Sequence, residues 1–268
     1  SANALRKYDM RQLVELGVSW VWVGFESAQS GYRKLKNADT VALTRELQSH
    51  GIRVQGSTIV GMEHHTPENI REEIEHAVAH DADCHQFMLY TPIPGTPLHA
   101  QIEKQGRILK GIDLADIHGQ YKFNFKHEHI ARDDSKSWLD FAFQHDYHVN
   151  GPSLYRIMRT MYEGWKRYRQ DSDARVRARF IAEADNLRRG YGAALWAMER
   201  YLRSSNQAIS ERIAELRKQM ESEFGVVSRV LDRVIGPLLL WSARREASAH
   251  PMGRPLEPRT FVERRNWG

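Results

Sequence analysis

Side chains able to recognise a small molecule follow three short apolar runs of the sequence. Glu26 and Ser27 follow the first run, and Gly61 follows the second. Tyr90 and Thr91 follow the third. A carboxylate accepts hydrogen bonds from hydroxyl or ammonium groups, and a glycine lets the main chain approach a flat ring closely. If the three runs are parallel strands, their C-terminal ends meet at one edge of a sheet, and we expect these residues to share one pocket there.

The histidines and the single cysteine give weaker signals. His64 and His65 are adjacent in the segment after the second run, and a solvated loop with the two rings pointing apart is the favoured interpretation. His76 and His80 stand four residues apart, a spacing able to share a metal on a helix, but no third ligand is identified and an exposed helix face is favoured. Cys84 cannot form an intrachain disulfide, which indicates a reducing compartment, and it is predicted to be a small buried residue.

The elements that must position these residues recur at a regular spacing. Trp20–Phe25, Val54–Val60 and Gln86–Tyr90 are predicted strands, and their first residues are 34 and 32 positions apart. A helix is predicted in each gap, one from Asp39 to His50 and one that starts at Thr66-Pro67. This alternation predicts an α/β fold with a parallel sheet, either open or part of a barrel, which three units cannot close by themselves.

The remaining patterns are a loop, one further strand and a series of helices. Thr91–Pro97 is a proline-rich loop before a predicted helix, Leu98–Gln105. Tyr121–Lys126 alternates and predicts an edge strand. From Ser135 onward the pattern predicts a helical bundle, with helices at Trp138–His148, Ser153–Tyr168, Ala174–Ser204, Ser210–Phe224 and Val227–Ser248.

Charge also divides the chain. Residues 1–150 carry 16 Lys and Arg against 20 Asp and Glu, whereas residues 151–268 carry 23 against 14. Twelve of the 13 histidines lie in the first of these two segments. Such a difference in composition indicates two domains. We expect an α/β domain over residues 1–134, a helical domain over 135–250 and an irregular tail over 251–268.

The basic helical half is predicted to be a packed domain. Its aromatic rings recur at helical spacing and are expected in a core rather than against nucleic acid. No apolar run approaches the roughly 18 residues that span a bilayer, so a cytoplasmic protein is expected, with peripheral contact at the inner membrane face as an alternative. Val226–Trp241, followed by Arg244-Arg245, is a basic amphipathic segment that can lie on an anionic membrane, although core packing is favoured. Pro237 should kink its helix near Ile235.

Three segments resemble one known family in their order and spacing. GVSWVWVGFES, GIRVQGSTIVGMEHHTPENI and HQFMLYTPIPGTPLHAQIEKQGRI are similar to the fourth, fifth and sixth strands of the radical S-adenosylmethionine (SAM) barrel. The MEHHTPENI turn and the PIPGTPL loop resemble its cobalamin (B12)-binding branch, and DLADIHGQYKFNF with the helical tail resembles the hopanoid C-3 methylases. The match covers about residues 10–110. The resemblance implies the C-terminal half of a partial TIM-like barrel, with an N-terminal portion missing.

The same resemblance implies roles for residues at the strand ends. Glu26 and Ser27 match the position that contacts the SAM ribose or its amino acid portion, with a surface carboxylate as the alternative for Glu26. Ile59 and Gly61 match the apolar floor beneath the adenine. Many relatives have a Leu-Pro-Gly-Glu-Thr run at 62–66, where this chain differs, so no glutamate is carried over there. Two further positions match a backbone contact to the adenine edge, Tyr90 and Thr91.

Radical SAM chemistry also requires three closely spaced cysteines on an iron–sulfur cluster. Cys84 is alone and outside any such motif, so the 4Fe-4S cluster and the cobalamin are expected to be bound by residues outside this chain, which is expected to be inactive by itself. The implied function is the C-terminal portion of a methyltransferase acting on an unactivated carbon of a polycyclic lipid such as a hopanoid. Two alternatives stay open: a radical SAM enzyme of another outcome, such as ring closure, and a non-catalytic basic helical module that docks on a membrane or a partner.

Overall fold

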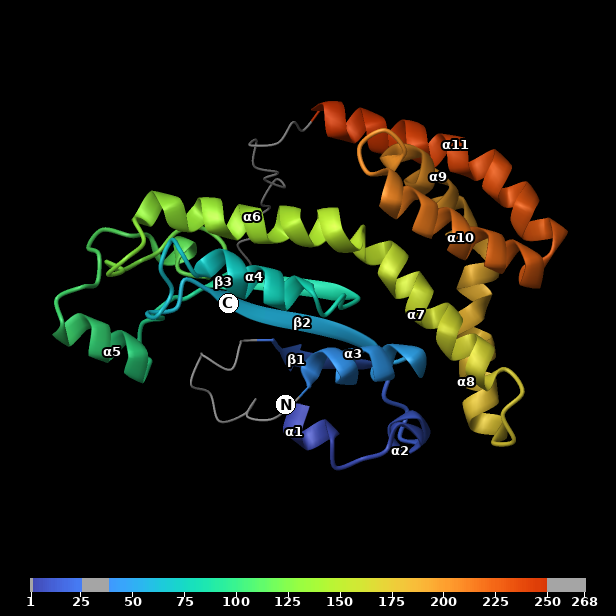
Figure 1. The fold of residues 1–268 in the computed structure, drawn as a ribbon, viewed down its shortest axis with the longest axis horizontal. Coiled ribbons are helices and arrows are strands. Elements are labelled where there is room, and N and C mark those ends of the chain that lie inside the picture. Colours follow the sequence, from blue (N-terminus) through green and yellow to red (C-terminus); the bar gives the residue numbers. More distant parts are fainter. Residues whose placement is uncertain (1, 26–38, 250–268) are drawn as a thin grey trace, which may run out of the picture. The chain divides into compact units, whose positions relative to one another are not determined.

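The computed structural model describes residues 2–25 and 39–249, and the chain divides into two compact units, residues 1–191 and 192–268 (Figure 1). The first unit combines a small sheet with helices. Its elements in chain order are α1 (Ala2–Leu5), α2 (Met10–Glu15), β1 (Trp20–Gly24), α3 (Thr40–Ser49), β2 (Arg53–Val60), α4 (Ile70–Val78), β3 (Cys84–Leu89), α5 (Pro97–Lys104), η3 (Leu114–Asp116), α6 (Arg132–Asn150), α7 (Ser153–Tyr168), α8 (Ala174–Asn186) and η4 (Leu187–Tyr191).

The sheet has three parallel strands in the order β1–β2–β3, so strands that follow one another in sequence are neighbours in space. Trp22 lies opposite Gln55, and Ser57 lies opposite both Gly24 and Gln86. All three predicted strands are present, and their bounds differ from the prediction by at most two residues. The prediction of an α/β fold with a parallel sheet is confirmed.

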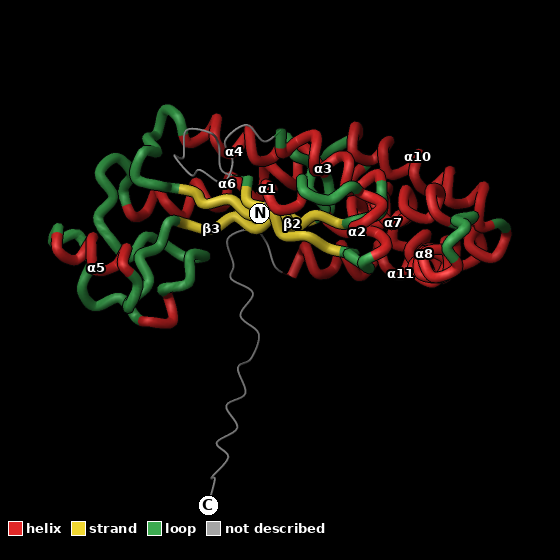
Figure 2. Tube along the Cα trace, turned by 90° about the horizontal axis from the view of Figure 1, so that it is seen from below, coloured by secondary structure: helices red, strands yellow, loops and turns green. Residues whose placement is uncertain are grey.

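The two faces of the sheet have different surroundings. On one face, Thr58 and Val60 of β2 are buried, and α3, α4, α6 and α7 pack against the strands. On the other face, Ser57 and Ile59 are half-buried and Trp22 is 63% exposed. Figure 2 views this second face, with the strands in front of α4 and α6. Parallel sheets usually have both faces covered. We call the second face the open face; its residues are Trp20, Trp22, Gly24, Arg53, Gln55, Ser57, Ile59, Cys84, Gln86 and Met88.

A buried ion pair holds the corner between α6 and α7 against the sheet. The guanidinium of Arg156 is fully buried and donates to both carboxylate oxygens of Asp146, at 3.1 and 2.6 Å. It also donates to the carbonyl of Ala82 at 2.7 Å, and the amide of the Asn150 side chain donates to the carbonyl of Val78 at 2.8 Å. These bonds join α6 and α7 to the end of α4 and to the loop before β3. The helices from α6 to η4 therefore belong to the first unit, whereas the sequence pattern separates a helical domain at residue 135.

The segment Tyr121–Lys126 does not form the predicted edge strand. It makes one antiparallel bridge, between Ile108 and Phe125, and does not join the sheet. The amide of Phe123 donates to the Ser135 hydroxyl at 3.2 Å. The Phe123 amide, which would have to donate to a neighbouring strand, is thus bonded to a side chain in the first turn of α6.

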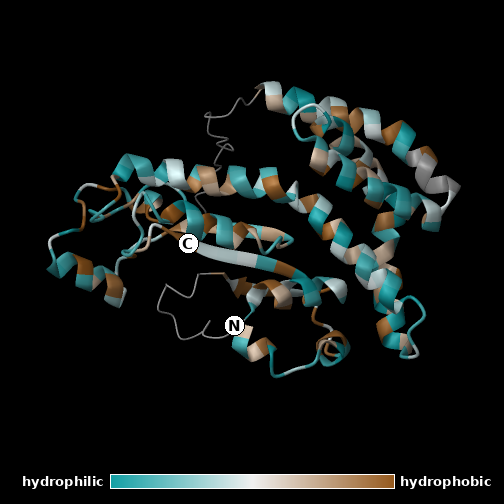
Figure 3. Cartoon of the chain, in the orientation of Figure 1, coloured by the Kyte–Doolittle hydropathy of each residue, from teal (hydrophilic) through white to brown (hydrophobic). Residues whose placement is uncertain are grey.

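The second unit contains the helices α9 (Gly192–Leu202), α10 (Gln207–Phe224) and α11 (Val226–Ala249) in its described part. The single helix predicted over Ala174–Ser204 is instead divided by the π-helical segment η4, where Gly190 and Gly192 weaken the preference for a regular α-helix. The α11 helix includes Pro237 and continues beyond it. Figure 3 shows hydrophobic and hydrophilic residues interspersed along all three helices.

Two glycines allow α9 and α11 to pack closely. A Cβ atom at Gly236 would lie 2.7 Å from the ring of Trp196, so the ring packs directly on the α11 backbone. A Cβ atom at Gly192 would lie 2.4 Å from the carboxylate of Asp232, which is buried. Burial raises the pKa of Asp232 to about 6. In the part of the chain that the structure describes, no helix is both long enough and apolar enough to cross a membrane.

Candidate functional site

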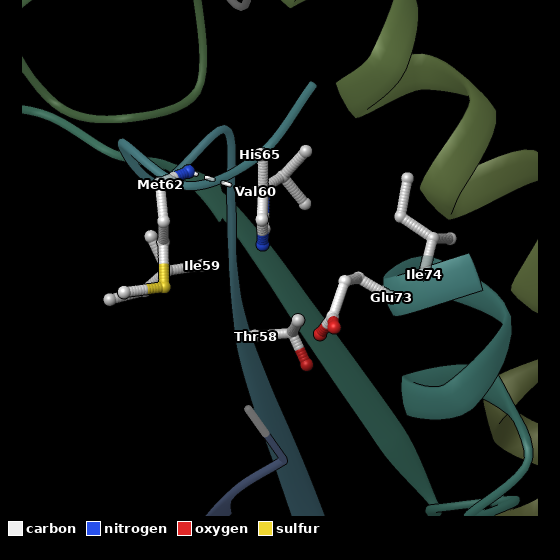
Figure 4. Close-up of a pocket in the computed structure, with 7 residues that line it drawn as sticks. All are labelled: Thr58, Ile59, Val60, Met62, His65, Glu73 and Ile74. Atoms are coloured by element: carbon white, nitrogen blue, oxygen red, sulfur yellow. Dashed lines mark hydrogen bonds between the residues drawn. The ribbon is translucent and has the colours of Figure 1, made fainter. Parts of the chain in front are cut away.

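Three of the predicted cofactor-contact residues lie together where β2 and β3 end. The amide of Tyr90 donates to the carbonyl of Val60 at 2.9 Å, which places Tyr90 next to Gly61. Ile59 is half-buried on the open face. Figure 4 shows Ile59 on the opposite side of β2 from Thr58 and away from α4. The structure therefore brings Ile59, Gly61 and Tyr90 to one end of the sheet.

The other three predicted residues have different outcomes. Thr91 is half-buried directly after Tyr90, and its hydroxyl donates to the carbonyl of Leu89 at 2.8 Å. Its side chain therefore closes a local turn at the end of β3. Glu26 and Ser27 lie outside the described residues.

A buried histidine fixes the turn that follows β2. His65 Nδ1 accepts hydrogen bonds from the amides of Gly61 and Met62, at 3.0 and 3.2 Å. Burial lowers the pKa of His65 to about 4, so the ring is neutral at neutral pH. An ion pair between Arg107 and Glu63, with 2.7 Å between nitrogen and oxygen, holds the same turn from outside. The predicted solvated loop is therefore wrong for His65, because its ring satisfies two main-chain donors.

Gly61 is packed against an aromatic ring of the chain itself. Its φ is +75°, and a Cβ atom there would lie 2.3 Å from Cζ of Phe123. The Phe123 ring stacks on His127, whose Nε2 lies 3.0 Å from the carbonyl oxygen of Met62. The sequence indicates that a flat ring approaches Gly61 closely. On the side where a side chain of residue 61 would stand, that ring belongs to Phe123. Sequence reasoning missed Phe123, whose segment alternates like an edge strand, and His127, which directly follows that segment.

A small cavity lies beside this turn on the helix-covered side of β2 (Figure 4). Its lining includes the imidazole of His65, the hydroxyl of Thr58 and the carboxylate of Glu73 from α4. Its volume is about 10 Å³, which is at the lower limit for one water molecule. A cofactor cannot enter it.

A larger groove of about 470 Å³ lies on the open face. It is lined by Trp20, Val21 and Trp22 of β1, by Gln55 of β2 and by Gln86 of β3. Exposed indole rings offer flat apolar surface, and side-chain amides can donate and accept hydrogen bonds. The alternation of tryptophan along β1 is the sequence signal for this groove.

Two further histidines are buried in the first unit. His80 Nε2 lies 2.8 Å from Oγ1 of Thr40, and His85 Nε2 lies 2.8 Å from Oγ1 of Thr58. Burial lowers the pKa of His80 to about 4 and that of His85 to about 3, so both are neutral at neutral pH. The predicted exposed helix face is confirmed for His76 and is wrong for His80, which is fully buried.

Cys84, predicted to be a small buried residue, is half-buried on the open face, and burial raises the pKa of its thiol. It begins β3 and therefore lies at the end of the sheet opposite to Gly61. Within residues 2–25 and 39–249, no group of three or more His, Cys, Asp or Glu could hold a metal ion. The described residues thus do not supply the thiolates that an iron–sulfur cluster needs.

The site offers surfaces for binding: a backbone turn at Gly61, the apolar side chain of Ile59 and the groove with its two indole rings. This chemistry suits a ligand with a flat ring and few charges. Comparisons with protein-family models, with curated proteins and with solved structures gave no match to the chain.

Proposed function

We propose that this chain forms the C-terminal part of a radical SAM barrel in a cobalamin-dependent enzyme, a methyltransferase acting on an unactivated carbon of a polycyclic lipid such as a hopanoid. One observation carries the proposal: three neighbouring parallel strands have helices on one face, and Ile59 points to the other. Barrel strands carry helices only on the outside, so a face without helices is what the interior of a barrel requires. We place this enzyme in the cytoplasm, at the inner face of the membrane that holds its lipid.

The described residues fit the adenine of SAM on one side of the Gly61 turn only. Phe123 occupies the side-chain position of Gly61, so the nucleoside would lie on the side to which Ile59 contributes apolar surface. Main-chain groups of Tyr90 and Thr91, at the end of the adjacent strand, would meet the adenine edge. When bound, SAM supplies the hydrogen-abstracting group and cobalamin the methyl group. The task of this chain is to bind and orient the nucleoside.

The iron–sulfur cluster does not fit the described residues, and none of them is assigned to the cobalamin. Cys84 is a lone thiol at the far end of the sheet, and a cluster needs several thiolates. We therefore assign no step through these groups to residues of this chain.

The groove on the open face is the proposed wall for the lipid. Trp20 and Trp22 are 42% and 63% exposed and can cover a fused-ring hydrocarbon. Gln55 and Gln86 can bind a polar group attached to it. The remaining substrate pocket would come from outside the described residues.

Calorimetric titration of the chain with SAM tests the nucleoside site. Ile59→Arg replaces the apolar floor with a cation, which should weaken SAM binding by about 10-fold or more, since SAM also carries a positive sulfonium. Ile93→Arg is the matched control, because Ile93 is exposed in the loop after β3. A chain that does not bind SAM, or equal affinities for the two variants, would overturn the proposal.

A further inference from the structure

The last described helix of the second unit, α11, presents large apolar side chains to solvent. Val230 is 55% exposed, Val234 62%, Leu238 64% and Trp241 61%. Their spacing of four, four and three residues places them on one side of α11. We call these four residues the α11 stripe. Apolar side chains scattered over a surface need no explanation, but four in line on one helix indicate an interaction site.

The opposite side of α11 is the one that packs in the bundle. Gly236 contacts the ring of Trp196, and the buried Asp232 lies against Gly192. Both contacts are with α9, so the orientation of α11 is fixed within the second unit. The α11 stripe is therefore not the core-facing side of this helix.

Arginines lie beside the α11 stripe, and the acidic residues of the helix lie elsewhere. At about 100° per residue, Arg233, Arg244 and Arg245 fall within about 80° of Trp241 around the helix, whereas Glu246 falls about 140° away. All three arginines are exposed. The guanidinium of Arg245 lies 5.5 Å from the centre of the Trp241 ring. The outward side of α11 thus combines apolar surface with positive charge.

We propose that α11 docks in the plane of an anionic lipid bilayer, with the α11 stripe among the acyl chains and the three arginines among the headgroup phosphates. Arg233 and Arg244 flank the apolar side of α11, and Arg245 follows Trp241 at its C-terminal end. An apolar helix side edged by arginine, with a tryptophan next to the cations, matches an interfacial helix. Since no described helix is fit to cross a membrane, α11 would lie along the surface. This docking does not require SAM or any other cofactor to be bound at the sheet of the first unit.

Two other occupants match this surface less well. If a second copy of this chain packed on the α11 stripe with two-fold symmetry, the arginines beside the two stripes would face each other. No carboxylate on the outward side of α11 would pair with these arginines. A nucleic acid would meet the arginines with its phosphates but would leave the α11 stripe against a charged backbone. A lipid surface satisfies both the charge and the apolar side chains.

Flotation of the full chain with phosphatidylcholine vesicles, with and without phosphatidylserine, tests the docking. The chain should float with the anionic vesicles and should be released by high salt. Leu238→Gln with Trp241→Gln should lower the bound fraction by about 10-fold or more, because the apolar anchor is lost. Arg244→Gln with Arg245→Gln should lower binding by a similar factor, and only with anionic vesicles.

Matched controls separate docking from general stickiness. Leu114→Gln changes an exposed leucine of the first unit, and Arg175→Gln with Arg189→Gln removes the same charge from exposed positions. Both controls should float like the unchanged chain, and circular dichroism should show that every variant is folded. The proposal is overturned if the unchanged chain does not float, if the controls lose binding equally, or if the α11 stripe variant converts a stable dimer to a monomer.

Discussion

Three buried histidines make the first unit sensitive to acid. Burial lowers the pKa of His65 and His80 to about 4 and that of His85 to about 3, from an ordinary value of 6.5. The unfolded chain therefore binds more protons than the folded chain between these values. Above pH 6.5 these histidines should not lower the free energy of unfolding. As the pH drops from 6.5 toward 4, the free energy of unfolding should fall by up to about 1.4 kcal/mol per pH unit for each histidine.

Urea unfolding at a series of pH values checks this dependence. His80→Gln can keep a hydrogen bond to Thr40 but does not titrate, so it should reduce the slope between pH 6.5 and 4 by about one proton. His76→Gln changes an exposed ring in α4, four residues before His80, and should change the slope much less. Equal slopes for the two variants would contradict the expected role of burial.

The Gly61 turn should tolerate no side chain. Gly61→Ala combines a positive φ with a clash against Phe123 and should lower the free energy of unfolding by about 2–4 kcal/mol. Gly95→Ala is the control, since Gly95 has a φ of +84° with open space around it, and should cost about 1 kcal/mol. Chemical denaturation measures both, and equal losses would mean that Phe123 does not restrict the turn.

For single residues, the sequence predicts the turn at Gly61 but not the side chains that contact it. A glycine directly after an apolar run predicts a sharp turn, and Gly61 has the positive φ that such a turn requires. The contacts of His65 and Phe123 come from side-chain packing over 4 and 62 residues of separation, which no local periodicity encodes. Adjacent histidines therefore looked solvated, although His65 is buried.

Among the helices, the corner between α6 and α7 depends on one buried ion pair. Asp146→Ala leaves the guanidinium of Arg156 buried without a counter-charge and should lower the free energy of unfolding by about 3–5 kcal/mol. Glu75→Ala removes an exposed ion pair with Arg71 and should cost less than about 0.5 kcal/mol. Thermal or urea unfolding distinguishes the two, and a loss below about 1 kcal/mol for Asp146→Ala would contradict the expected role.

Elements with local signals were predictable, and elements that depend on distant partners were not. The helix Ser153–Tyr168 has its predicted bounds, because Gly151 and Pro152 stop the preceding helix and an apolar stripe follows. Tyr121–Lys126 alternates like a strand, but whether it pairs is decided by the sheet edge, and Ser135 takes one of its amides. Alternation with a period of two indicates which residues share a face of a strand. It does not indicate whether a second strand lies beside it.

For the molecule as a whole, two units with separate cores should unfold in two steps. Ile74 is buried in the first unit and Ile213 in the second. Ile213→Ala should destabilise the second unit by about 2–5 kcal/mol and shift one transition, whereas Ile74→Ala should shift the other. Circular dichroism during urea unfolding measures both transitions, and a single transition moved by either change would contradict independent units.

The tryptophans of the open face give the protein an intrinsic optical reporter. Trp20 and Trp22 are two of its seven tryptophans, and both expose much of their indole to water. Any molecule that covers this face must remove water from these rings, so emission would move to shorter wavelength and acrylamide would quench it less. Trp241 of the α11 stripe is also exposed, so occupancy of the open face is followed in a Trp241→Phe chain, before the occupant is identified.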